Sequence, residues 1–250
     1  MKYTAVFRAK MPINLLITEK PAQNLEKQGL NDIRKINVAS CLIFLLLLCG
    51  CTSMSELPDY VVINKPECLN RNILTAPAQP VLFPLSETDQ HIIEVLITKF
   101  RNEKNCAGLA APQLGFHKRI IVFEVQDDPH LKKWRPDLTD TMPMALWINP
   151  SYRGMGDEKI SDFEGCFSVN DLGGTVSRFK KISWQAYDRE GHMIQGIAEG
   201  FLARVIQHEV DHINGTLFID LVPEGKLLPI EIYRKKRAEA IKNGREIPQD

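Results

Sequence analysis

The sequence predicts an α+β fold in which strands are grouped before a late helix, and three segments carry this prediction. "RIIVFEV" at 119–125 has the β-branched content of a buried strand. "KISWQAYD" at 181–188 alternates in polarity and runs into an Asp-Arg-Glu-Gly turn, which is typical of a hairpin. Apolar residues at helical spacing then predict a helix at about 199–213.

The remaining segments extend this outline. Ser86 can cap a helix, and the apolar spacing after it predicts a helix at about 87–103. "ALWIN" at 145–149 is expected to be a second strand, and a last helix is expected at about 228–243. The proline-rich segment 58–84 is expected to be extended and to wrap around the domain. Small residues predict a loop at 106–115, and three prolines predict a surface segment at 126–143.

Composition limits the classes of function. The chain has 250 residues, of which 44% are hydrophobic and 25% charged, as expected of one globular domain with extensions. Its 31 basic and 31 acidic residues give a net charge of zero, so we expect no dedicated nucleic-acid site. The six cysteines lack the regular spacing of a disulfide scaffold, which favours a reduced, cytoplasmic compartment from residue 60 onward.

Residues 1–57 are interpreted as a leader. The apolar run at 38–51, "VASCLIFLLLLCGC", is short for a membrane span but has the length of a signal-peptide core. Cys51 resembles the lipidated cysteine of a bacterial lipoprotein, which would imply export through residues 34–51. The alternative is a translation start placed too early, with the real start near Met54, and the sequence leaves both open.

The stretch "HEVDH" predicts a metal site. His208 and His212 are four residues apart, so a helix places both imidazoles on one face. Phe201 and Val205 fall on the same stripe, so this face points inward, where two histidines without a shared purpose would be costly. Glu209 then stands beside the ligands, where it can handle protons for a water molecule. The alternative is a pair of ordinary core or surface histidines.

The third ligand is less obvious from the residues alone. The acidic residues after His212 stand in no convincing frame for a zinc peptidase. Upstream, Cys166 lies in "EGCFS" and follows a glycine, which suits a tight turn that aims a thiolate. Taken alone, however, a single cysteine is more often a small buried hydrophobe.

Three separated motifs resemble those of the peptide deformylases, in that family's order. They are "AGLAAPQLG" at 107–115, "EGCFS" at 164–168 and "QHEVDHINGTLF" at 207–218. The resemblance covers about residues 60–222. It implies small antiparallel or mixed sheets around a central metal-binding helix. It also implies a metal-dependent catalytic domain at 58–222, followed by a C-terminal helix or tail at 223–250.

The same resemblance implies an activity and a cofactor. Members remove the formyl group from the N-terminal formyl-methionine of newly made polypeptides and release formate, so the nascent chain is the expected partner. Cys166, His208 and His212 would hold one divalent ion, leaving a fourth position open. Fe(II) is the expected native ion, and Zn, Ni or Co are also possible.

Further roles follow from the resemblance. Glu209 would act as the base toward the attacking water and then as the acid toward the leaving amine. Gln113, through its side-chain N–H, and Phe167, through its backbone N–H, would stabilise the oxyanion. Glu164 would orient the ligands. The substrate is expected to pair with the Gly108–Leu109 backbone. Its methionine would enter a pocket made by Ala107, Leu109, Val205 and Ile206.

The chain departs from the family pattern at four positions. Cys106 replaces a glycine, so it would strain the loop if that position needs positive φ, or it would bring a second thiol near the metal. Phe167 stands in place of leucine, where only the N–H matters, and Asn170 replaces a common proline. Gly173 stands about where some members carry a substrate-contacting arginine, which predicts weaker peptide binding.

Two other functions compete with a deformylase. One is an exported metallo-amidase or peptidase on the same scaffold, and the other is a binding protein that has lost activity. The first is separated from a deformylase by its substrate, and the second is disfavoured by the intact set of polar site residues. "RKKR" at 234–237 is a candidate contact to ribosomal RNA, although a solvated helix face is the simpler explanation.

Overall fold

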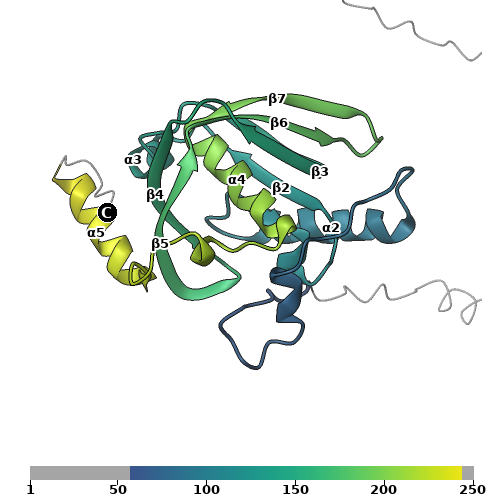
Figure 1. Ribbon diagram of the computed structural model, residues 1–250, viewed down its shortest axis with the longest axis horizontal. Helices are drawn as coiled ribbons and strands as arrows, with labels where there is room; N and C mark the ends of the chain where they lie inside the picture. Colours follow the sequence, from purple (N-terminus) through teal and green to yellow (C-terminus); the bar gives the residue numbers. More distant parts are fainter. Residues whose placement is uncertain (1–56, 244–250) are drawn as a thin grey trace, which may run out of the picture. The chain divides into compact units, whose positions relative to one another are not determined.

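The computed structural model describes residues 57–243, which form one unit of two antiparallel sheets and four helices. The predicted leader at 1–57 lies outside the described residues, except for Leu57. Within the described range, none of the helices combines the length and apolarity needed to cross a membrane. Figure 1 shows α4 running between the two sheets, with α2 and α5 on opposite sides of the unit.

The larger sheet has five strands in the order β1-β2-β3-β6-β7, and every neighbouring pair is antiparallel. Its strands are β1 (Gly108–Ala110), β2 (Ile120–Val125), β3 (Met142–Gly154), β6 (Lys181–Tyr187) and β7 (Met193–Glu199). The predicted strand at 119–125 and the predicted hairpin after 181 are therefore present. β1 lies at the edge of the sheet, as the resemblance implied for Gly108 and Leu109. Local patterns do not show this strand, because only pairing with β2 makes so short a stretch a strand.

The resemblance implied more than one small sheet, but local patterns predicted none of the strands of the smaller sheet. This sheet consists of β4 (Lys159–Cys166), β5 (Val169–Phe179) and β8 (Leu228–Pro229), in that order. β4 and β5 form a hairpin whose residues include adjacent glycines and many polar side chains, which hides the alternation that marks a strand. This hairpin carries the "EGCFS" motif.

Three of the four described helices, α2, α4 and α5, agree closely with the predicted positions. The four helices are α2 (Glu87–Asn102), α3 (Pro129–Trp134), α4 (Gly200–Asn214) and α5 (Ile230–Lys242), with short 3₁₀ turns η1 (Arg71–Leu74), η2 (Ala111–Leu114) and η3 (Phe218–Asp220). Ser86 caps α2 by accepting a hydrogen bond from the Asp89 backbone N–H. Gly215 ends α4 in the left-handed conformation, at φ 77°.

β2 divides the core into two halves, and helix α4 packs in one of them. Ile121 and Phe123 point from one face of β2 into the cluster that packs around α4. Ile120 and Val122 point from the other face into the cluster beneath α2. Nearly every residue of α4 is buried, so any polar side chain it carries must find a partner inside the protein. The predicted α+β class with a central helix is confirmed.

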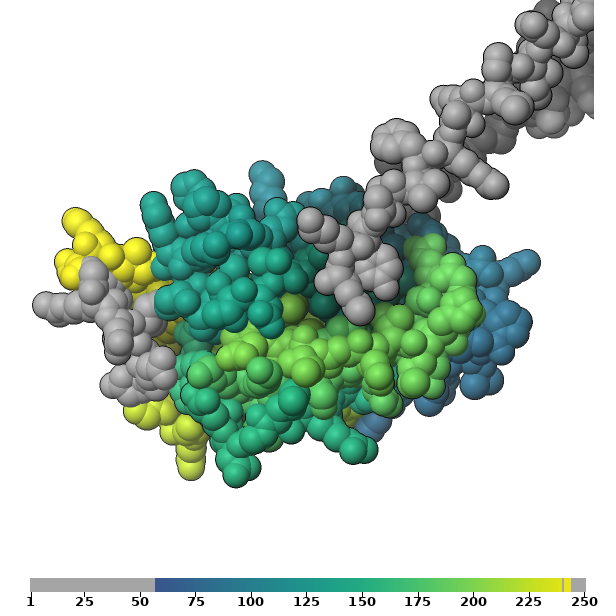
Figure 2. Space-filling view, turned by 90° about the horizontal axis from the view of Figure 1, so that it is seen from above, coloured from purple at the N-terminus to yellow at the C-terminus, as the bar shows by residue number. Residues whose placement is uncertain are grey.

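Three segments differ from the predicted outline. The strand expected at 145–149 continues to Gly154, because Asn149 takes a left-handed conformation (φ 49°) and a register shift carries the strand past Pro150. The segment expected to be a surface excursion contains α3, and the expected loop at 106–115 contains β1 and η2. Figure 2 shows α5 in yellow at one end of the unit and α2 in blue at the other.

Candidate metal centre

The second and third motifs meet in space. Cys166 comes from the end of β4, and His208 and His212 come from α4, and their ligand atoms lie within 4.8 Å of one another. The Cys166 Sγ is 3.2 Å from the His212 Nε2. One tetrahedral ion would hold a sulfur and a nitrogen ligand about 3.5 Å apart. The geometry and the donor set therefore fit a single divalent ion.

The end of the β4–β5 hairpin aims the thiol. The register shifts between Gly165 and Cys166, so Cys166 pairs with Val169 across a two-residue turn. The Ser168 backbone N–H donates to the Cys166 Sγ over 3.4 Å. This turn directs the sulfur toward α4 rather than toward solvent.

Glu164 braces the histidine ligand. Its Oε2 lies 2.8 Å from the Nδ1 of His208, which leaves the Nε2 of that ring free. Arg178 donates to both carboxylate oxygens at 2.9 Å, and Arg204 donates to Oε1 at 2.8 Å. Burial opposes ionisation of Glu164, but these hydrogen bonds and charges hold the pKa of its carboxyl well below the usual range.

Glu209, unlike Glu164, has a carboxylate oxygen without a hydrogen-bond partner among the described residues. Its side chain is buried, and its Oε2 has no hydrogen-bond partner in the structure. Burial raises the pKa of Glu209 to about 7. A Cβ on Gly108 would lie 2.4 Å from the Glu209 Oε1, so the carboxylate reaches the position where β1 passes it closely. A buried carboxylate without a partner at this point is a candidate acid–base group.

Gln113 and Phe167 flank Cys166. The Gln113 Oε1 accepts from the Ala110 N–H at 2.8 Å, which directs its Nε2 to the Cys166 Sγ at 3.3 Å. Phe167 follows Cys166 in the turn, and its ring is 37% exposed and stacks on Tyr60. The structure therefore places both predicted oxyanion donors beside the thiol.

The outer edge of β1 pairs with no further strand in the described part of the chain, although the Cys106 thiol donates to the Gly108 carbonyl oxygen there. The Glu124 N–H donates to the Ala107 carbonyl, so in the antiparallel ladder residues 107 and 109 bond to β2. The N–H and C=O of Gly108 then point outward, as pairing with an added strand requires.

Two side chains of the predicted methionine pocket have no exposed surface in the structure. Leu109 and Ile206 are completely buried, Leu109 beneath α2 and Ile206 in the cluster around α4. The alternation of β1 explains this, since Gly108 faces Glu209 and Leu109 must face the other way. Ala107 is half-buried and packs against the cluster that contains Val205, so these two remain candidates for the pocket.

Cys106 causes no backbone strain. Positive φ falls on Asn105 (58°), and Cys106 is not among the left-handed residues of the described chain. Its thiol donates to the Gly108 carbonyl oxygen over 3.1 Å, and it does not belong to the group formed by Cys166 and the two histidines. Cys106 is thus engaged with β1 rather than placed as a further ligand.

Gly173 has a structural explanation. A Cβ at this position would lie 2.0 Å from the ring of Phe163, which packs over the glycine. Phe163 in turn stacks on Tyr233 of α5, with the ring planes 7° apart. An arginine at position 173 would require this aromatic pair to move.

The prediction of a basic patch at 234–237 needs a correction. Arg237 is buried and donates to Asp162 and to the Tyr233 hydroxyl, whereas the other three residues of "RKKR" are exposed. Sequence reasoning also missed Arg178 and Arg204, although arginine in an otherwise apolar helix such as α4 is a usable signal for a buried ion pair.

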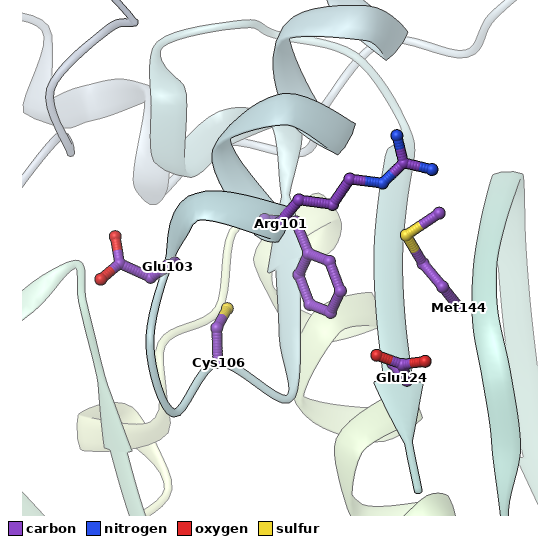
Figure 3. Close-up of a pocket in the computed structure, with 6 residues that line it drawn as sticks. Arg101, Glu103, Cys106, Glu124 and Met144 are labelled. Atoms are coloured by element: carbon purple, nitrogen blue, oxygen red, sulfur yellow. The ribbon is translucent and has the colours of Figure 1, made fainter.

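A separate pocket of about 420 Å³ lies where α2 connects to β1. Figure 3 shows Glu103 and Cys106 on this connection, with Met144 and Glu124 on the neighbouring strands. Its lining shares no residue with the group that forms the candidate metal centre.

Comparisons with known proteins agree with this site. The family model of polypeptide deformylases matches residues 64–227. Peptide deformylase 2 of Rickettsia conorii is 52% identical over 189 residues, which cover 74% of this chain and 93% of that protein. The peptide deformylase of Chromohalobacter salexigens is 34% identical over 170 residues, which cover 68% of this chain and 92% of its own.

A solved structure is also similar to this chain. The Met-Ala-Ser-bound class I type b peptide deformylase from Acinetobacter baumannii aligns with a TM-score of 0.57 and 29% identity. The alignment covers 68% of this chain and all of that one. Together with the converging motifs, these relatives establish that the chain belongs to the peptide deformylase family.

Proposed function

We propose that this enzyme removes the formyl group from the N-terminal formyl-methionine of newly made polypeptides through the site around Cys166. The observation that carries the proposal is the unpartnered Glu209 carboxylate, buried beside the converged Cys166, His208 and His212. Family membership supports the reaction, and the relatives favour it over the alternative of an exported amidase or peptidase.

Cys166, His208 and His212 would hold one divalent ion. The Glu164–His208 hydrogen bond fixes the ring, and the thiolate with two imidazoles admits Fe(II), our proposed native ion, as well as Zn, Ni or Co. When bound, the ion supplies Lewis-acid activation of water and of the formyl carbonyl.

The protein's own groups handle the protons and the developing charge. Glu209 takes the proton of the attacking water through its free carboxylate oxygen. As the bond between the formyl carbon and the methionine nitrogen breaks, Glu209 returns that proton to the nitrogen, so formate and a free amino terminus leave. The Gln113 side-chain N–H and the Phe167 backbone N–H donate to the carbonyl oxygen as its negative charge develops.

The free edge of β1 would hold the peptide. Pairing with Gly108 places an extended substrate beside Glu209, which lies against that glycine. Ala107 and Val205 would contact the methionine side chain. A related deformylase is known in complex with Met-Ala-Ser, a peptide of the product type.

The direct test is formate release from a formyl-Met-Ala-Ser peptide. The protein would be purified without oxygen and loaded with Fe(II) or Ni(II). We expect turnover that stops on addition of a chelator and returns with the metal. Release of an amino acid from the unformylated peptide, without formate release from the formylated one, would instead identify a peptidase.

We also infer the setting of the reaction. The substrate chemistry supports a cytoplasmic catalytic domain at 58–222, which the C-terminal segment 223–250 follows in the sequence. The exposed Lys235 and Lys236 are the candidates for a ribosome contact. Replacing both by glutamate should weaken ribosome co-sedimentation without changing formate release from the free peptide, and unchanged co-sedimentation would contradict the inference.

A further inference from the structure

The segment 60–64 touches two residues at which this chain departs from the family pattern. Tyr60 contacts Phe167, and Asn64 contacts Asn170. Phe167 lies in the turn that follows Cys166, and Asn170 lies at the start of β5, directly after that turn. A shared partner for two unusual residues suggests that the segment and the turn work as a unit.

On one side, the segment is bound to the loop that carries Gln113. The Val61 backbone N–H donates to the Gln113 carbonyl oxygen at 2.8 Å. The side chain of Val61 is buried, so this hydrogen bond is sheltered from water. The backbone of Gln113 is therefore held by the segment, while its side chain reaches the Cys166 thiol.

On the other side, the segment is bound to the turn that carries Phe167. The Ile63 N–H donates to the Ser168 carbonyl oxygen at 2.9 Å. The Asn64 side chain both donates to the Asn170 carbonyl and accepts from the Asn170 N–H, each at 2.8 Å. Proline, common at this position in the family, has no N–H and cannot complete this pair.

Tyr60 holds Phe167 from the side. The two rings stack with centroids 4.8 Å apart and planes 9° apart. The Tyr60 hydroxyl donates to Glu103 at 2.9 Å, and the Lys99 ammonium lies 4.6 Å from the centre of its ring. Both anchors belong to the end of α2 or the residue after it, so Tyr60 ties the exposed Phe167 to a rigid helix.

We propose that residues 60–64 form a clamp that fixes the Phe167 backbone N–H relative to the Gln113 amide, with Tyr60 as a positioning residue. The inference rests on the proposed function, in which these two groups stabilise the oxyanion. The two donors come from different parts of the fold, η2 and the β4–β5 turn, and the clamp is bonded to both. A small displacement of either donor weakens charge stabilisation more than ground-state binding.

The test compares kcat and KM of the metal-loaded enzyme for formyl-Met-Ala-Ser. Tyr60→Ala removes the stack, and we expect kcat to fall about 10- to 100-fold while KM changes less than about threefold. Tyr60→Phe keeps the stack and loses only the hydroxyl, so it should restore most of kcat. Tyr187→Ala is the matched control, because it removes an aromatic contact, with Phe83, outside the clamp.

Asn64 gives a second variant that avoids the loss of a large side chain. Asn64→Ala removes both hydrogen bonds to residue 170, and we expect kcat to fall about three- to tenfold. Asn170→Ala is its control: the Asn64 side chain bonds only the backbone of residue 170, so both bonds survive. Its kcat should equal that of the wild type.

The outcomes separate the clamp from the proposed function. If the wild type releases no formate, the proposed function fails before the clamp is tested. If the wild type is active and Tyr60→Ala and Asn64→Ala keep its kcat, the clamp is overturned. A lower melting temperature with unchanged kcat would show a purely structural role and would also overturn it.

Discussion

Glu164 and Glu209 are two carboxylates buried to nearly the same extent, with 5% and 3% of their surface exposed, yet their surroundings are opposite. Glu164 has partners at both oxygens, from Arg178, Arg204 and His208, and its pKa is held well below the usual range. Glu209 has one oxygen without a partner, and burial raises its pKa to about 7.

This difference in partners and pKa separates a carboxylate with a structural role, Glu164, from one suited to proton transfer, Glu209. The low pKa of Glu164 favours its charged form, and this charge holds an imidazole and two guanidinium groups. Glu209 is poised near neutral pH, where a carboxylate can both accept and return a proton. The two groups reach these states within one small region of the core, so partners rather than depth of burial determine the role.

Glu209→Gln tests the chemical side of the comparison and has the largest expected effect. The amide keeps the volume of the side chain but cannot take a proton, so kcat for formate release should fall about 10²- to 10⁴-fold. Metal content, measured by mass spectrometry, should stay at one ion per chain. Substantial remaining activity would contradict the assigned role of Glu209.

Glu164→Ala tests the structural side. It leaves the buried Arg204 without its carboxylate and Arg178 with Asp211 alone, so we expect a loss of about 3–5 kcal/mol in the free energy of unfolding. Metal affinity should fall about 10- to 100-fold because His208 loses its orienting partner. Urea unfolding and metal titration measure the two effects, and an unchanged unfolding midpoint would show that the arginines find other partners.

Gly108→Ala sharpens the comparison by crowding Glu209. The added Cβ would lie 2.4 Å from the Glu209 Oε1 and would displace the carboxylate. We expect kcat to fall about 10- to 100-fold, because a misplaced base loses its alignment with the water. Gly156→Ala is a control for loss of a glycine, since no atom lies within 4 Å of the added Cβ although φ is 81° there. Wild-type activity in Gly108→Ala would show that Glu209 is not confined by β1.

Arg237→Ala probes another braced carboxylate, away from the metal centre. Arg237 donates to Asp162 at 2.9 Å and to the Tyr233 hydroxyl at 2.7 Å, while Arg135 also binds Asp162. We expect a loss of about 1–3 kcal/mol in the free energy of unfolding and an unchanged kcat.

The exposed Arg234 provides the control for this variant. It pairs only with Glu231 on the surface, so Arg234→Ala should leave both the free energy of unfolding and kcat unchanged. Equal losses in the free energy of unfolding would show that the buried Arg237–Asp162 pair stabilises the fold no more than the exposed Arg234–Glu231 pair does.

The sequence predicted the parts of the fold that depend on local patterns. Helices α2 and α4 were found because apolar spacing and caps such as Ser86 and Gly215 are local signals. The β4–β5 hairpin was missed because Gly173 and Gly174 interrupt its alternation. The register shift at Asn149, which lengthens β3, depends on hydrogen bonds to the distant Val81.

In the candidate site, too, the features carried by motifs were predicted, and those that depend on contacts between distant segments were not. The convergence of Cys166, His208 and His212 was predicted from three motifs, and the structure brings these residues together. The pairing of Glu164 with Arg178 and Arg204 joins β4, β5 and α4, so no local pattern contains it. The burial of Leu109 depends on which face of β1 meets α2, which the motif does not specify.

The most direct test of this account measures formate release by Glu209→Gln and Glu164→Gln side by side, both saturated with metal. The account predicts that Glu209→Gln loses at least about 100-fold in kcat, since the proton acceptor is gone. Glu164→Gln should stay within about tenfold of the wild type, because excess metal compensates for weaker ligand orientation. Equal losses, or a larger loss in Glu164→Gln, would contradict the division of the two buried carboxylates into a base and a brace.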